Sequence, residues 1–334
     1  MSPMEAAQQW SDLTYGGVAI QYLALLARDF GALYLIGVAF FFVERIKPAV
    51  PTQRFFKTDF KTELTYPLFN TMFSTPMFTL LLTGVTVYFL EPLMPHQVLV
   101  GWVETLPFVA QVFIALLIAD VAVYIEHRFL AHRSLWDYHA LHHMTPEVSW
   151  LTVARVHPVN AMTIALVGAI LRFVFGFSGE AVVASAWIVG ALVYWEHANL
   201  DVGLPKPFCY LLVSPRFHRW HHAKEAEAVG KNFCLIFPFL DLLGGSYYCP
   251  DRMPHGYGLY VAPDASEEEK QAAEVPDDFR GQLIYPFRRS WEKIRLSFAP
   301  RPPQIASLTP TDQRNAATPS VEPEPVSDSA ASSL

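Results

Sequence analysis

The chain has 334 residues, of which 52% are hydrophobic and 16% are charged, and its formal net charge at pH 7 is −7. Soluble domains carry roughly 25% charged residues, so this composition, with its long uncharged runs, indicates a membrane protein. The modest negative charge and the lack of a basic face argue against nucleic acid as a partner. Three cysteines, Cys209, Cys234 and Cys249, are too few and too scattered for a disulfide framework.

Two apolar runs predict an N-terminal transmembrane region within residues 1–105. They cover about residues 16–43 and 64–90, and each is long enough to cross a bilayer, which takes about 20 residues. The loop between them contains five basic residues, which are Arg45, Lys47, Arg54, Lys57 and Lys61. Because Lys and Arg concentrate in short cytoplasmic loops, we expect this loop on the cytoplasmic side.

Three further apolar runs follow, at about residues 106–125, 159–175 and 181–194. The first would return the chain to the cytoplasmic side, and the other two are typical of a helical hairpin that enters from that side and returns to it. We therefore expect an all-α fold, a polytopic membrane bundle of about 4–5 transmembrane helices. The protein would be an integral, multi-pass membrane protein whose polar segments beyond residue 125 lie on the cytoplasmic face.

The C-terminal part of the chain is polar. Residues 249–298 are predicted to form a cytoplasmic extension. Residues 299–334 are rich in Pro, Ser, Ala, Thr and Glu and cannot bury enough apolar surface to order themselves, so this tail is predicted to be disordered.

Histidine is concentrated in the middle of the chain, where ten of the twelve histidines fall between positions 127 and 222. The motif HxxHH occurs twice, at 139–143 and at 218–222, and residues three and four apart share one face of a helix. Neutral imidazole suits zinc, copper, iron and nickel, and two metals with three to five ligands each would account for the number. The candidate metal ligands are His127, His132, His139, His142, His143, His157, His197, His218, His221 and His222. The predicted topology brings them all to one membrane face, the cytoplasmic one.

Two details of this cluster depend on helix geometry. His127 and His132 are five residues apart, roughly 140° on an ideal helix, so they share a face only if the helix ends or distorts between them. Asp120 lies seven residues before His127, on nearly the same face. Since metal-bound histidines usually donate to a carboxylate or a carbonyl, we expect Asp120 behind one of the ligands as a hydrogen-bond acceptor.

The order and spacing of these motifs are similar to those of a known family. The matching residues lie within about residues 106–248 and are Asp120, Tyr124, His127-Arg128, His132, Leu135-Trp136, His139, His142-His143, His197, Pro215-Arg216, His218, His221-His222, Asn232-Phe233, Asp241 and Gly244-Gly245. In these positions the sequence resembles the fatty acid hydroxylase/sterol desaturase superfamily of membrane di-iron oxygenases.

The resemblance implies a catalytic domain at 106–248 and two iron ions as cofactors, held by the histidines. It further implies that O2 is activated with electrons from a separate donor, of the cytochrome b5, ferredoxin or pterin type. The implied reaction is hydroxylation or desaturation of a lipid, such as a sterol or a fatty acyl chain, at an unactivated C–H bond. An active site at the bilayer surface can take such a substrate directly from the lipid phase.

Two other classes of membrane protein remain as alternatives. A b-type haem electron carrier would need pairs of histidines inside the membrane spans, whereas here the histidines follow the span ends. A zinc transporter or sensor would place carboxylates near the bilayer midplane. A zinc protease is not supported, because the chain contains no HExxH motif.

Overall fold

The computed structural model describes residues 31, 34–54, 56–57, 59–85, 103, 105–173, 175–272 and 274–297. The chain divides into two compact units, residues 1–290 and 291–334. In the second unit the structure describes residues 291–297, which are the last residues of helix α13. The histidines discussed above all belong to the first unit.

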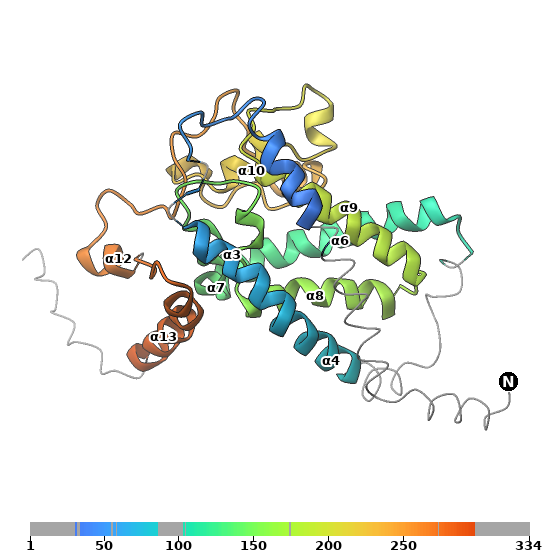
Figure 1. The fold of residues 1–334 in the computed structure, drawn as a ribbon, viewed down its shortest axis with the longest axis horizontal. Coiled ribbons are helices and arrows are strands. Elements are labelled where there is room, and N and C mark those ends of the chain that lie inside the picture. Colours follow the sequence, from blue (N-terminus) through green and yellow to red (C-terminus); the bar gives the residue numbers. More distant parts are fainter. Residues whose placement is uncertain are drawn as a thin grey trace, which may run out of the picture. The chain divides into compact units, whose positions relative to one another are not determined.

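The described residues form helices joined by loops, as Figure 1 shows. The α-helices are α3 (Phe60–Phe69), α4 (Thr75–Val85), α6 (Phe108–Glu126), α7 (Trp136–His143), α8 (Pro158–Phe173), α9 (Gly179–His197), α10 (Pro215–His221), α11 (Phe239–Gly244), α12 (Glu267–Ala272) and α13 (Phe279–Ser297). The π-helices are η1 (Asn70–Ser74) and η3 (His127–Ser134), and the 3-10 helices are η4 (Thr152–Ala154), η5 (Phe208–Tyr210) and η6 (Ala226–Ala228). Within these residues β pairing is limited to an isolated bridge between Ala223 and Tyr257. The predicted all-α class is therefore confirmed.

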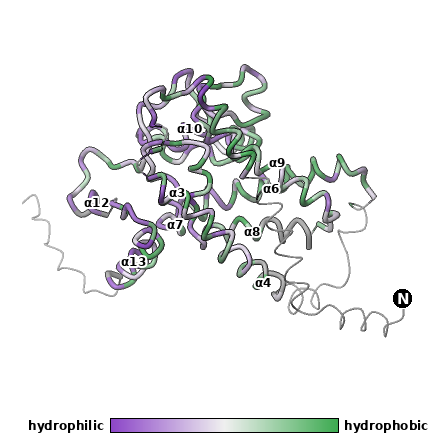
Figure 2. The backbone as a smooth tube through the Cα atoms, in the orientation of Figure 1, coloured by the Kyte–Doolittle hydropathy of each residue, from purple (hydrophilic) through white to green (hydrophobic). Residues whose placement is uncertain are grey.

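Helix α6 packs against both α8 and α9 (Figure 1). On one side Ala115 and Ala119 are buried against Phe177, and on another Leu116 is buried with Ala181 of α9. Small residues let helix backbones approach closely. Figure 2 shows α6 and α9 as mainly hydrophobic, whereas hydrophilic residues are frequent around α10 and along α13.

One helix in the described part of the chain is long and apolar enough to cross a membrane. It runs over Phe108–Ser134, which is α6 together with η3, and a shorter apolar helix covers Tyr34–Val43. The predicted hairpin at 159–175 and 181–194 is present as the neighbouring helices α8 and α9. The expected number of 4–5 transmembrane helices, the cytoplasmic location and the boundaries of the predicted domains remain predictions.

Several of the predicted segments fall outside the described residues. Parts of the predicted spans 16–43 and 64–90 belong to this group, and so does the whole of the predicted tail at 299–334.

The two helices that carry the HxxHH motifs, α7 and α10, are each attached to a neighbouring helix. Helix α7 follows η3 directly, so it is connected to α6 without an intervening loop of its own. Helix α10 packs against α9 and starts with Pro215 in its first turn, after Ser214, whose hydroxyl accepts the backbone N–H of Phe217 at 3.3 Å. A serine cap followed by proline is a favourable helix start, so the sequence itself sets the position at which the second HxxHH motif becomes helical.

Candidate metal centre

Nine of the ten predicted ligands meet in two groups. The five-histidine group consists of His127, His132, His139, His143 and His221. The four-histidine group consists of His142, His197, His218 and His222. Within each group the candidate ligand nitrogens all lie within 4.8 Å of one another. The chain positions that meet here are up to about 95 residues apart.

A π-helix brings His127 and His132 to the same side. These residues are in η3, the π-helical continuation of α6, and its last turn is closed by a hydrogen bond from Leu135 N to Leu130 O at 2.8 Å, five residues back. In a π-helix hydrogen bonds join residues five apart instead of four, so residues with this separation stack on one face. The distortion that the spacing required is therefore present, and the two ring centroids lie 5.0 Å apart.

Each HxxHH motif contributes to both groups. On α7, His139 and His143 belong to the five-histidine group and His142 to the other. At α10 the division is reversed: His218 and His222, the residue that caps this helix, belong to the four-histidine group, and His221 belongs to the five-histidine group. Residues four apart lie one above the other on a helix, and the remaining histidine of each motif, which lies between them, points toward the other histidine group. The groups touch through His143 and His222, whose rings stack with centroids 4.5 Å apart.

The hydrogen bonds at Nδ1 show which ring nitrogen of each histidine directs a lone pair toward the centre of its group. His127 Nδ1 lies 2.9 Å from Phe233 O, and His139 Nδ1 lies 2.9 Å from Asn160 Oδ1. An oxygen of this kind accepts only, so Nδ1 carries the proton and Nε2 presents a lone pair. The two Nε2 atoms are nevertheless 3.0 Å apart. Two lone pairs cannot hydrogen-bond to each other, whereas a shared cation would satisfy both.

The four-histidine group repeats this arrangement. His197 Nδ1 donates to Val193 O at 2.7 Å, so its Nε2 also presents a lone pair. That atom lies 3.0 Å from Nε2 of His142 and of His218. In the five-histidine group His221 Nδ1 donates to Lys231 O at 2.8 Å, and its buried Nε2 has no hydrogen-bond partner. The donor sets therefore fit a pair of transition-metal ions that accept imidazole nitrogen.

Burial keeps these rings neutral. Desolvation lowers the pKa of His197 to about 3, despite the hydrogen bond to Val193 that opposes the shift. Burial, reinforced by the neighbouring imidazoles, also holds the pKa well below the usual range for six others, which are His139, His142, His143, His218, His221 and His222. Neutral imidazole is the form that ligates metals, so the site is prepared for metal at pH 7.

Asp120 lies behind the site but contacts a loop. Its carboxylate accepts the backbone N–H groups of Leu235 at 2.7 Å, Ile236 at 3.2 Å and Phe237 at 2.6 Å. Asp241 holds the preceding residues of the same loop, since it accepts the N–H groups of Phe233 and Cys234 at 2.9 and 2.8 Å. The loop in turn offers the carbonyl of Phe233 to His127. The sequence placed Asp120 directly behind a histidine, but in the structure it reaches His127 through this loop.

The structure does not bring His157 to either group. Its Nε2 donates to Leu283 O of α13 at 3.1 Å, and its Nδ1 accepts the backbone N–H of Val159 at 3.1 Å. Both ring nitrogens are thus occupied by backbone groups. His157 also contacts the rings of Tyr138 and Phe287 at centroid distances of 5.0 and 5.7 Å, so its position is that of a buried anchor between the histidine helix α7 and the C-terminal helix.

Several groups that orient the histidines were not found from the sequence. The carbonyls of Phe233, Lys231 and Val193 are backbone atoms and leave no mark in a sequence pattern. Asn160 follows His157 by three residues, and only this proximity to a histidine could have drawn attention to it. Glu196 differs from these groups, because its position directly before His197 is visible in the sequence. In the structure it is completely buried, and burial raises its pKa well above the usual value for glutamate.

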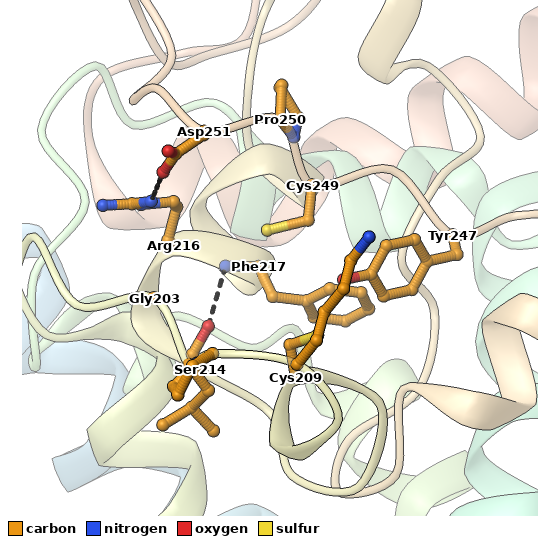
Figure 3. A pocket seen from close by; sticks show the side chains of 12 residues that line it. Gly203, Cys209, Ser214, Arg216, Phe217, Tyr247, Cys249, Pro250 and Asp251 are labelled. Atoms are coloured by element: carbon orange, nitrogen blue, oxygen red, sulfur yellow. Dashed lines mark hydrogen bonds and ion pairs between the residues drawn. The ribbon is translucent and has the colours of Figure 1, made fainter.

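A separate cavity of about 320 Å³ lies behind α10. In Figure 3 Arg216 pairs with Asp251 and Ser214 accepts from Phe217 N, while the rings of Phe217 and Tyr247 form one side. None of the clustered histidines lines this cavity. It is therefore distinct from the space between the two histidine groups.

Comparison with known proteins shows similarity across the same region. The family model described as fatty acid hydroxylase matches residues 112–246, which include all nine clustered histidines. An ornithine lipid hydroxylase from Rhizobium tropici is 26% identical over 201 residues, which is 60% of this chain and 57% of that protein. A very-long-chain aldehyde decarbonylase from Oryza sativa subsp. indica is 28% identical over 138 residues, covering 37% of this chain and 21% of the relative. The chain thus spans less than two thirds of the length of either relative, and no solved structure matches it.

Proposed function

We propose that the protein is a membrane-bound di-iron oxygenase that uses O2 to hydroxylate or desaturate a lipid, since residues 112–246 match the family model described as fatty acid hydroxylase. The observation that carries the proposal is the convergence of nine imidazoles into two adjacent groups whose inward nitrogens are lone-pair donors. When bound, a pair of iron ions would supply the oxidising chemistry at an unactivated C–H bond, with electrons from a separate donor of the cytochrome b5, ferredoxin or pterin type.

The chain's own residues would hold and shield the metal pair. The nine histidines would be the ligands, and the backbone carbonyls and Asn160 behind them fix the direction of their rings. The histidines of α7, α9 and α10 are buried, which excludes water from the site. Exclusion of water protects a reactive oxidant from side reactions.

The position of the site favours a substrate from the lipid phase. The five-histidine group begins at the end of the Phe108–Ser134 helix, whose outer side exposes Ile125, Phe129 and Leu130. Apolar side chains at the end of a candidate span suit contact with acyl chains. We propose that the protein is a multi-pass membrane protein with this site on the cytoplasmic face, where an acyl chain can reach it from the bilayer.

The named relatives favour an acyl lipid over a sterol. One is a hydroxylase of ornithine lipid and the other a decarbonylase of very-long-chain aldehydes. We propose an acyl-chain lipid as the substrate class of this chain.

The two alternatives fit the geometry less well. A haem iron takes at most two axial protein ligands, whereas each group presents four or five nitrogens. A zinc transport site would be expected to include carboxylates, and the two groups consist of histidine.

Metal analysis combined with lipid analysis tests the proposal. Purified protein is expected to contain two iron ions per chain and no haem absorption, and cells that express it are expected to contain an oxidised lipid that is missing from cells without it. One zinc per chain, or a haem spectrum, or an unchanged lipid profile under O2 would refute the proposed function.

A further inference from the structure

Glu196 is a buried acid for which the proposed function has no role so far. It is the residue before the end of α9, and its side chain is 0% exposed. Neither carboxylate oxygen has a hydrogen-bond partner. Burying an unpartnered carboxyl group is costly, so its presence at this position needs a reason.

The carboxylate faces two rings of the four-histidine group. Its Oε1 lies 3.7 Å from His197 Nδ1, and its Oε2 lies 3.6 Å from His218 Nδ1. His197 Nδ1 already donates to Val193 O. His218 Nδ1 is itself buried without a partner. Two unpartnered groups, one a donor and one an acceptor, thus face each other at a distance that a small rotation of either side chain would close to a hydrogen bond.

The five-histidine group is supported differently. The Nδ1 partners recorded for it are the neutral oxygens of Phe233, Asn160 and Lys231. A carboxylate, Glu126, stands one step further back, where it accepts the hydroxyl of Thr163 at 2.7 Å and the amide of Asn160 at 3.4 Å. A neutral amide therefore separates this acid from the imidazole, whereas Glu196 faces its imidazoles directly.

We propose that Glu196 is a positioning residue for the metal of the four-histidine group, and that its carboxylate makes the two metal positions inequivalent. It accepts the Nδ1 proton of His218, which fixes the ring with Nε2 directed inward. When it is ionised against a bound cation, it also places a negative charge directly behind this group, whereas Glu126 reaches the five-histidine group only through Asn160. In a buried site such a charge strengthens the binding of a cation more than it would in water. This inference rests on the proposed function only in that the site must bind metal.

Metal titration of the metal-free protein tests the inference without any need for lipid oxidation. The protein is stripped with a chelator and titrated with Co²⁺, whose absorption reports imidazole ligation, in competition with a chelator of known affinity. We expect two binding steps in the native protein. Glu196→Gln keeps the shape and removes the charge, and it is expected to weaken one step by about 10–100-fold, the usual effect of losing a hydrogen-bonding partner behind a ligand, and to leave the other unchanged. Glu196→Asp keeps the carboxylate but holds it at a greater distance, so the affinity of the weakened step is expected to lie between those of the native protein and Glu196→Gln.

Glu126→Gln is the matched control, because it makes the same replacement at the acid behind the other group. Glu196→Gln is expected to weaken one metal-binding step, and Glu126→Gln is expected to leave that same step unchanged. The melting temperature of the metal-free protein separates positioning from folding. For Glu196→Gln it is expected to equal or exceed that of the native protein, since glutamine keeps the shape of the side chain and cannot ionise.

The outcomes distinguish this inference from the proposed function. If the native protein binds no pair of ions, the proposed function fails. If the native protein binds two ions, the inference is overturned either by a Glu196→Gln variant with two unchanged steps or by one in which both steps weaken together with a lower metal-free melting temperature. In protein loaded with ⁵⁷Fe, the same inequivalence predicts two Mössbauer doublets, of which Glu196→Gln shifts one.

Discussion

Replacement of Asp120 by asparagine tests whether the loop behind the metal site is held by this carboxylate. In the native protein one oxygen accepts from Leu235 N, and the other accepts from Ile236 N and Phe237 N. Asparagine keeps one acceptor oxygen and turns a donor NH₂ toward the remaining N–H, so at least one buried N–H loses its partner. Such a loss costs about 1–3 kcal/mol, and the bonds that remain change from charge-assisted to neutral at roughly 1 kcal/mol each.

The total expected for Asp120→Asn is a loss of about 2–4 kcal/mol in the free energy of unfolding, after allowance for the relief of burying one charge less. At about 2–4 °C per kcal/mol for a domain of this size, the melting temperature of the purified protein in detergent is expected to fall by roughly 4–16 °C. The control is Asp251→Asn, because Asp251 pairs with Arg216 while its own side chain is 98% exposed, and exposed ion pairs contribute little. If the two variants melt at the same temperature, the assignment of Asp120 as the anchor of the loop is wrong.

Three further predictions concern the histidines and the topology. His142→Ala and His221→Ala each remove one ligand from a different group, so both are expected to abolish lipid oxidation and to lower the bound iron. His157 lies outside both groups, so His157→Ala is expected to keep two irons per chain. Equal iron loss in all three variants would contradict the assignment. For the metal-free protein, His197 has a folded pKa of about 3 against roughly 6.5 when unfolded, so the unfolded state binds more protons between these values. The contribution of each such histidine to the free energy of unfolding is therefore fully present above about pH 6.5 and is lost toward pH 3, by about 1.4 kcal/mol per pH unit. Denaturation midpoints that do not change between pH 7 and pH 5 would contradict this. A topology reporter fused after residue 300 is expected to give a cytoplasmic signal, and a signal from the opposite side would refute the predicted orientation.

Helix periodicity was sufficient to predict much of the site. The spacing of HxxHH places histidines on a common face, and the structure does gather nine of the ten candidates. The family resemblance stated from these motifs is confirmed by the match over residues 112–246. What spacing could not give is the division of each motif between two groups, since this depends on how α7 and α10 face each other across the bundle.

The parts that could not be predicted depend on tertiary contacts. No residue pattern marks η3 as a π-helix, although the five-residue separation of His127 and His132 required some such distortion. His157 is a histidine in the same stretch of chain as the ligands, so the sequence alone does not separate it from them. In the structure the backbone of α13 and of Val159 occupies its two nitrogens. The helix face alone predicts Asp120 on an imidazole, but the backbone of the loop at 233–237 binds its carboxylate, and this loop leaves no mark in the helical pattern.

The crossed division of the two HxxHH motifs has a mechanical consequence. Since α7 and α10 each supply ligands to both positions, two bound ions would cross-link these helices at two points. Two cross-links would prevent the helices from rotating about each other as well as from separating. Removing one ion would leave a single pivot, about which the helices could turn without coming apart. The rigidity of the centre should then depend on the second ion bound far more than on the first.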